Sequence, residues 1–237
     1  MSELLIVQNI SREGPGLLEH VLRDEGVAFD LVDLGKGQEI PDLDSYKALV
    51  VLGGPDSAND ETAKMTGELG RIKEALGAGL PYLGICLGLQ TLVKAAGGKV
   101  IPGDTKEVGF IDPDNNQHTV AVTEEGKNDP LLTGLPETLD VFQLHGETVE
   151  LTPDMTVLAT GKFCKNQIVR VADKAYGIQS HFELTPEMLA IWAEHDPDLM
   201  PIGKDKLRAD FEAIKQSYTN IGQTLLRNFL RIAELVK

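Results

Sequence analysis

The sequence predicts an α/β fold: an open, mostly parallel sheet flanked by helices on both faces, with a mixed or antiparallel extension and a C-terminal amphipathic helical segment. Short apolar runs alternate with segments whose apolar residues recur every three or four positions, as in parallel strands connected by helices. From about residue 107 the runs become shorter and are separated by turn residues. We expect residues 1–237 to form a single domain, with a helical extension from about residue 200 to residue 237.

The first part of the chain is expected to alternate strands and helices. Strands are expected over residues 4–7, 28–33, 48–52 and 80–85. Helices are expected from residue 17, over about residues 61–76, and directly after residue 86. Because the strand segments are almost continuously apolar, they suit a parallel sheet that is covered on both faces.

The middle of the chain is expected to extend this sheet with short strands. Turn-rich stretches at residues 112–116 and 151–154 separate strand-like runs between about residues 107 and 180. This pattern predicts a mixed, partly antiparallel extension. It ends in a predicted strand over residues 175–183.

Helices are expected again near the C-terminal end. Thr185 and Pro186 supply a capping hydroxyl followed by a proline at the first helical position. From Leu207 onward, apolar residues recur at helical spacing, which predicts one long amphipathic helix or two helices joined near Gly222. We expect this segment to pack on the chain's own sheet, with a homodimer contact or a contact with a second protein as the alternative.

Composition excludes several classes of function. The chain carries 22 Lys and Arg against 37 Asp and Glu, which argues against nucleic acid or a membrane surface as a partner because phosphate binding requires clustered basic residues. Two cysteines provide neither a disulfide framework nor a Cys-rich metal site, so a reducing cytoplasm is the expected location. The chain begins without a basic leader, and no apolar run approaches the roughly 20 residues needed to cross a bilayer. His118 and His195 lack metal-ligand spacing and are expected to be solvated.

Cys86 is the candidate nucleophile. It lies between Gly84 and Gly88, where an apolar strand is expected to turn into a helix. Flanking glycines let the backbone crowd together and push the side chain out at the end of the strand, as in a nucleophile elbow. Free N–H groups and the positive dipole end of the helix favour the thiolate over the thiol. A small buried cysteine in a tight turn is the alternative interpretation.

His181 and Glu183 are the candidate base and its orienting acid. In an extended chain, alternate side chains share one face, so these two side chains are expected to point the same way. A carboxylate beside an imidazole fixes its tautomer and stabilises the imidazolium, which a Cys–His pair requires. A histidine at a strand edge beside a solvated glutamate is the alternative.

Backbone amides are the candidate oxyanion donors. Residues 50–55 form an apolar strand that ends in Gly53 and Gly54, and glycines expose backbone N–H groups to a ligand without obstruction by side chains. We expect the amides of Gly54 and of Leu87, the residue after the nucleophile, to face a developing negative charge.

The order of these segments resembles the class I, triad-type glutamine amidotransferase domain. The resemblance spans roughly residues 48 to 183 and is carried by the stretches at residues 53–55, 84–90, 107–110 and 179–183. Residues 141–147 and 164–167 resemble the subgroup of stand-alone domains akin to the glutaminase part of GMP synthase.

The resemblance implies a function and several roles. Cys86 would attack the side-chain amide of glutamine, a thioester would form, ammonia would leave, and water would release glutamate. His181 would act as general base and acid, and Glu183 would orient it. The residues that would hold the glutamine are Gly53, Gln90, His145 and Gly146. No cofactor and no metal are implied, and the ammonia would pass to a separate synthetase.

Two departures from the family pattern stand out. The family usually has an aromatic residue before the catalytic histidine and a proline after it, whereas this chain has Ser180 and Phe182. The early loop at residues 8–11 lacks the Asp-aromatic-Gly pattern of many synthetase-bound members. Both departures weaken an assignment to GMP synthase itself and leave the acceptor of ammonia open.

Two other functions remain as alternatives. A γ-glutamyl hydrolase or peptidase would use the same triad to release an amine other than ammonia. A redox sensor or binding module would use the thiol without acylation, but it has no use for a His–Glu pair and oxyanion donors.

Overall fold

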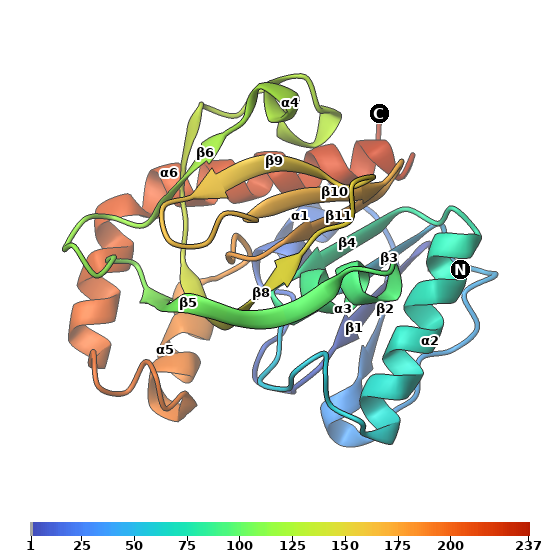
Figure 1. The fold of residues 1–237 in the computed structure, drawn as a ribbon, viewed down its shortest axis with the longest axis horizontal. Coiled ribbons are helices and arrows are strands. Elements are labelled where there is room, and N and C mark those ends of the chain that lie inside the picture. Colours follow the sequence, from blue (N-terminus) through green and yellow to red (C-terminus); the bar gives the residue numbers. More distant parts are fainter. Residues whose placement is uncertain (1) are drawn as a thin grey trace.

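The computed structural model describes residues 2–237, which form a nine-stranded sheet and a separate two-stranded sheet (Figure 1). The strands of the large sheet are, from one edge to the other, β2 (Phe29–Asp33), β1 (Leu4–Gln8), β3 (Ala48–Val51), β4 (Tyr82–Ile85), β11 (Ala175–Ile178), β10 (Ile168–Ala172), β9 (Thr156–Gly161), β6 (Thr119–Val122) and β7 (Thr138–Asp140). Pairing is parallel from β2 to β11 and antiparallel from there to β7. The predicted α/β class with an antiparallel extension is confirmed.

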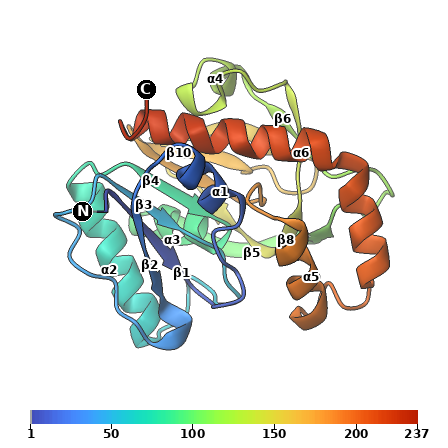
Figure 2. The same ribbon diagram turned by 180° about the vertical axis from the view of Figure 1, so that it is seen from behind.

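Helices cover both faces of the large sheet, because its central strands are apolar on both sides (Figures 1 and 2). Leu4 and Ile6 of β1 pack into one core, and Leu5 and Val7 pack into the other. The first core contains side chains of α1 (Leu17–Asp24) and α6 (Lys204–Ile232), and the second contains those of α2 (Ala63–Gly77) and α3 (Leu87–Ala95). Short helical segments, η1 (Leu34–Lys36), α4 (Glu124–Lys127) and η2 (Pro130–Leu132), lie in the connections.

The small sheet joins the large one through shared apolar cores. It pairs β5 (Lys99–Gly109) with β8 (Gln143–Glu150) in antiparallel fashion. Val100 and Val149 pack with the side chains of α3. At the other end, Phe110 and Phe142 enter a third core with the helices that follow β11.

The C-terminal helices are α5 (Pro186–His195) and α6, which is continuous through Gly222. As predicted, Thr185 caps α5, and its Oγ1 accepts a hydrogen bond from Met188 N at 3.3 Å. One long amphipathic helix, rather than two, packs against the chain's own cores. No helix within residues 2–237 has both the length and the apolar character that a bilayer crossing requires.

The last parallel strand is shorter than predicted. The expected strand over residues 175–183 ends at Ile178, because the chain then changes its hydrogen-bonding partners. Gln179 N donates to Gln167 O at 2.8 Å, and His181 N donates to Phe142 O, also at 2.8 Å. His181 and Glu183 therefore lie in a bent segment after the strand, not on a regular strand face.

Replacing Gly222 by Ala tests how closely α6 is docked. A Cβ added there would collide with the carbonyl oxygen of Phe182 and lie 2.8 Å from Leu17 Cδ2. We expect Gly222→Ala to lower the free energy of unfolding by about 1–3 kcal/mol through overpacking. Gly67→Ala on α2 is the matched control: nothing lies within 4 Å of its added Cβ, and the substitution should raise stability by roughly 0.5–1 kcal/mol. Urea unfolding followed by circular dichroism measures both, and equal stabilisation by the two substitutions would contradict the close packing.

Candidate active site

Cys86 sits in a strained turn between β4 and α3. Its backbone has φ 52 and ψ −105, a conformation that a non-glycine residue rarely adopts. Cys86 N donates to Ile178 O at 2.7 Å, while its carbonyl accepts from Leu89 N at 3.0 Å and Gln90 N at 3.1 Å. These bonds fix the residue at the carboxyl end of a central strand and at the first turn of a helix, as an elbow requires.

The glycines around Cys86 allow the close approach of three backbone segments. A Cβ added to Gly84 would collide with the carbonyl of Gly88, and one added to Gly88 would collide with the carbonyl of Val51. The helix can therefore start directly against β3 and β4. Glycine at these two positions is a steric requirement of the turn.

His181 and Glu183 form a buried hydrogen-bonded pair. The distance from His181 Nδ1 to Glu183 Oε1 is 2.6 Å, and the exposed fractions of the two residues are 1% and 2%. Glu183 Oε2 accepts a second hydrogen bond, from Phe182 N at 2.9 Å. Burial disfavours the imidazolium, but the Glu183 carboxylate and a hydrogen bond with the Cys86 side chain outweigh it, so that the pKa of His181 is raised well above 6.5.

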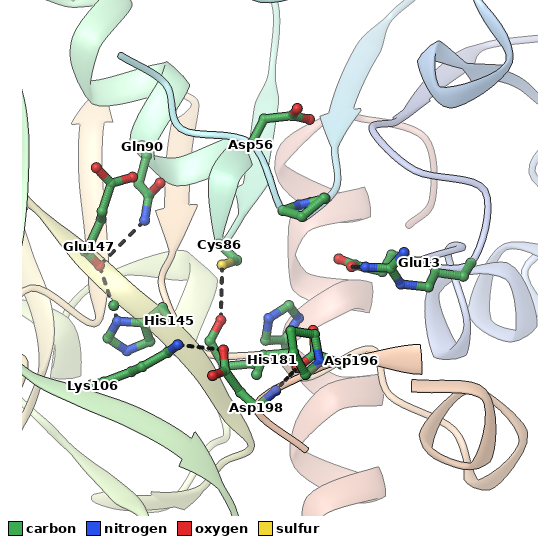
Figure 3. A pocket seen from close by; sticks show the side chains of 16 residues that line it. Glu13, Asp56, Cys86, Gln90, Lys106, His145, Glu147, His181, Asp196 and Asp198 are labelled. Atoms are coloured by element: carbon green, nitrogen blue, oxygen red, sulfur yellow. Dashed lines mark hydrogen bonds and ion pairs between the residues drawn. The ribbon is translucent and has the colours of Figure 1, made fainter. Parts of the chain in front are cut away.

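Cys86 and His181 open into a cavity of about 330 Å³ (Figure 3). Of the other residues that the sequence predicted for the site, Gly54, Gln90, His145 and Gly146 line this cavity. Gly53, Leu87 and Glu183 lie directly behind its lining. A Cβ added to Gly53 would lie 3.5 Å from Cys86 Cβ, and one added to Gly54 would lie 3.3 Å from Leu87 Cδ2.

The wall opposite the elbow is formed by β8. Leu144 O lies 3.8 Å from Cys86 Sγ, and Gln90 Nε2 lies 3.4 Å from Glu147 O. Gln179 lies beneath both, with its Nε2 at 3.7 Å from Cys86 Sγ and its Oε1 at 3.4 Å from Gln90 Nε2. Polar groups of α3, β8 and the segment after β11 therefore surround the sulfur.

The imidazole of His145 belongs to a buried hydrogen-bond network. Its Nε2 lies 3.2 Å from Gln143 Oε1 and 3.3 Å from Glu107 Oε2, and its Nδ1 lies 3.1 Å from Glu147 O. His118 Nδ1 lies 3.5 Å from the other oxygen of Glu107. The prediction that His118 is solvated is wrong, because the Glu107 carboxylate holds it at 4% exposure; His195, at the end of α5, is exposed as expected.

This network also contains the one group of donors within residues 2–237 whose spacing suggests a metal site. Single donor atoms of Glu107, His145 and Cys164 all lie within 4.8 Å of one another. Each residue already has a protein partner: Cys164 Sγ, for example, lies 3.2 Å from Thr148 Oγ1. The donor set fits a hydrogen-bonded support for β5 and β8 better than a metal centre.

The sequence prediction missed the residues that form the rim of the cavity. They come from the loops after β1 and β3, from β5, from β8 and from the loop after α5, and they are Arg12, Glu13, Asp56, Lys106, Glu147, Asp196 and Asp198. Lys106 Nζ and Asp198 Oδ2 form an ion pair at 2.5 Å across two of these segments. Ligands usually bind to such sheets at the loops that follow the carboxyl ends of parallel strands. This rule could have identified the loops after β1 and β3 from the sequence. It could not have identified the rim residues after α5, because they follow a helix.

Helices α5 and α6 hold the His181 segment in place. The ring of Trp192 packs edge-on against the His181 ring, with centroids 5.1 Å apart, and its Nε1 donates to Arg12 O at 3.1 Å. Tyr218 OH donates to His181 O at 2.9 Å and accepts from Leu184 N at 3.3 Å. The C-terminal helices thus orient the imidazole and connect it with the loop after β1.

Known proteins resemble this chain over most of its length. The family model for class-I glutamine amidotransferases matches residues 16–190. The glutamine amidotransferase-like protein YfeJ of Salmonella typhimurium is 28% identical over 225 residues, which cover 92% of this chain and 91% of that protein. The glutamine-hydrolysing GMP synthase of Porphyromonas gingivalis is 31% identical over 78% of this chain, but the match spans only 34% of that relative. The crystal structure of a glutamine amidotransferase from Thermotoga maritima matches with a TM-score of 0.85 and 28% identity, covering 98% of each chain.

Replacing Glu183 by Gln should change the titration of His181. Because the pKa of His181 is raised in the folded protein, its charged form contributes stability that is complete below about 6.5 and is lost as the pH rises through the raised value. Without the carboxylate charge, burial dominates and the pKa of His181 should fall below 6.5. Nitrogen NMR of labelled histidine should show an imidazolium at neutral pH in the parent protein and a neutral ring in Glu183→Gln.

Glu147→Gln is the matched control for this measurement. Glu147 also lines the cavity, but its side chain pairs with Ser57 and not with the imidazole. The His181 titration should be unchanged in this variant. An equal effect of the two substitutions would contradict a specific role for Glu183.

Proposed function

Because the chain belongs to the class-I glutamine amidotransferase family, we propose that it hydrolyses the side-chain amide of glutamine to glutamate and ammonia. Members of this family are amide hydrolases. The observation that supports this proposal most directly is the buried hydrogen bond between Glu183 and His181, together with the position of His181 and Cys86 in the lining of one cavity. A protein that used the thiol only as a sensor would have no need for this pair.

In the proposed reaction, the proton of Cys86 already resides on His181 before the substrate binds, and the Cys86 thiolate beside the imidazolium attacks the amide carbon of glutamine. The negative charge that develops on the amide oxygen is stabilised by the backbone N–H groups of Gly54 and Leu87. His181 then gives the proton to the departing nitrogen, the C–N bond breaks, and ammonia leaves a γ-glutamyl thioester. Water, deprotonated by His181, attacks the thioester and releases glutamate. Glu183 holds the imidazole in the required tautomer throughout.

The glutamyl part of the substrate would lie between Cys86 and β8. Gln90 and the backbone around His145 and Gly146 line this part of the cavity, and Gly53 borders the sulfur. In this proposal the imidazole of His145 holds β8 in position through Glu107, and the neighbouring backbone contacts the substrate. The binding energy therefore comes from polar groups that are fixed before the substrate arrives.

The released ammonia would be used by a separate synthetase. The chain spans about a third of the length of the Porphyromonas gingivalis relative, whose name includes both glutamine hydrolysis and GMP synthesis. We propose that residues 1–237, α6 included, act as one glutaminase domain in the cytoplasm, where its free cysteines stay reduced. In this proposal the partner synthetase binds the molecule that accepts the ammonia.

Replacing Cys86 by Ala should reduce glutamine hydrolysis by a factor of roughly 10³ or more, because the nucleophile acts as a unit with its base. Release of glutamate and ammonia is the measurement. Cys164→Ala is the matched control, since Cys164 is the other free cysteine and does not line the cavity of Cys86, and this variant should retain most of the activity. A chloroketone analogue of glutamine should alkylate Cys86 and leave Cys164 unmodified, as peptide mass spectrometry can show. Undiminished hydrolysis by Cys86→Ala would refute the proposed mechanism.

A comparison of two substrates separates this proposal from a γ-glutamyl peptidase with the same triad. We expect kcat/KM for glutamine to exceed that for a γ-glutamyl dipeptide, because the proposed leaving group is ammonia. Both reactions are followed by the release of the amine product. Rapid cleavage of the dipeptide with negligible turnover of glutamine would support the peptidase instead.

A further inference from the structure

Glu13 places a carboxyl group in the cavity, and this group has no role in the reaction proposed above. It lies in the loop between β1 and α1, is 8% exposed, and lines the same cavity as Cys86 and His181. The loop is fixed at this point, because Glu13 N donates to Ile10 O at 3.0 Å and the neighbouring Arg12 O accepts from Trp192 at 3.1 Å. The carboxyl group is therefore held beside the reacting groups.

The carboxyl group, the imidazole and the nucleophile converge on one point. A Cβ added to Gly53 would lie 3.3 Å from Glu13 Oε2, 3.2 Å from His181 Cε1 and 3.5 Å from Cys86 Cβ. Only the absence of a side chain at Gly53 keeps this point free. The Glu13 carboxyl group therefore borders the same gap beside Gly53 as the imidazole ring and the Cys86 side chain.

Glu13 has little protein around it to satisfy its charge. Within residues 2–237 its one ion pair is a long contact of 3.9 Å with Arg12. Burial raises the pKa of Glu13, and the nearby positive charges of His181 and Arg12 oppose this only in part. A buried carboxyl group that faces a cavity with so weak a partner is available to a hydrogen-bond donor on a ligand.

The two sides of the cavity differ in what they can bind. Gln90 and Glu147 lie on one side of Cys86, and Glu13 and Asp196 lie on the other (Figure 3). The proposed glutamyl part occupies the first side. The leaving nitrogen must lie next to His181, which protonates it, and therefore on the side of Glu13.

We propose that Glu13 binds the leaving amine of the substrate by accepting a hydrogen bond from its N–H group. The inference rests on the proposed function and extends it. When the C–N bond breaks, the electron pair of the bond stays on nitrogen, His181 supplies the proton, and Glu13 neither gains nor loses one. The departing nitrogen then carries several N–H donors, and Glu13 Oε2 provides an acceptor for one of them. The substrate class is thus a γ-glutamyl amide whose leaving nitrogen keeps at least one N–H.

A pair of substrates tests this proposal without relying on overall activity. Glutamine and the γ-methyl ester of glutamate share the glutamyl part, but the methoxy leaving group has no N–H to donate. Glu13→Leu should lower kcat/KM for glutamine by about 10- to 100-fold, the range for losing a charged hydrogen-bond partner. Glu13→Gln, which keeps a neutral acceptor, should lose less. Both variants should hydrolyse the ester within about threefold of the parent rate, since kcat/KM reports the acylation step.

Glu19→Leu serves as the control variant, because Glu19 lies on α1 and pairs with Arg23 at the surface. It should leave both reactions unchanged. Equal loss of amide and ester hydrolysis in Glu13→Leu would overturn the inference in favour of a structural role, and so would no loss with either substrate. Failure of the parent protein to hydrolyse either compound would instead overturn the proposed function, and the inference with it.

Discussion

The active site depends on the backbone of Cys86, which is held at a positive φ by its neighbours. Such a conformation costs a non-glycine residue about 1–3 kcal/mol and persists only where the surroundings determine it. Here β4 pairs with β11 in register, so that Ile85 lies opposite Ile178, and Ile178 O accepts the N–H of Cys86. Because β4 and β11 run parallel, the segment after β11 leaves the sheet at the carboxyl ends of the strands, next to Cys86. The pairing of β4 with β11 therefore holds Cys86 in its strained conformation and also brings His181 close to it.

The base is positioned by parts of the chain that are distant in sequence. After Ile178 the chain leaves the sheet, and His181 is fixed by Phe142 before β8, by Trp192 on α5 and by Tyr218 on α6. The aromatic core that contains these side chains also packs against Phe110 at the end of β5. The C-terminal helices are thus part of the support of the imidazole. This explains why a helix as long as α6 is docked closely enough to require glycine at position 222.

The sequence allowed the elements that carry continuous apolar runs to be predicted, because those strands are buried on both faces and alternate with amphipathic helices. It also indicated Cys86, since two glycines around a cysteine at a strand end have a direct steric meaning. The pairing of His181 with Glu183 was expected for a wrong geometric reason: the strand stops earlier, and the two side chains meet in a bend. The burial of His118 was predicted wrongly, and Glu13 was not identified. Both environments are created by long-range contacts, between β5 and its neighbours or around Gly53, which leave no local periodicity in the sequence.

The residue after His181 shows how a departure from the family pattern can be accommodated. A proline, the usual residue there, has no backbone N–H, whereas Phe182 N donates to Glu183 Oε2 at 2.9 Å. This bond holds one carboxylate oxygen of Glu183 while the other, Oε1, faces His181 Nδ1 at 2.6 Å. The Phe182 ring stacks on Tyr218 with centroids 6.5 Å apart, and Tyr218 in turn holds the carbonyl of His181. Tyr218 of α6 therefore restrains both the residue after His181 and the carbonyl of His181, and in this way the C-terminal helix can take over the restraint that a proline ring would give.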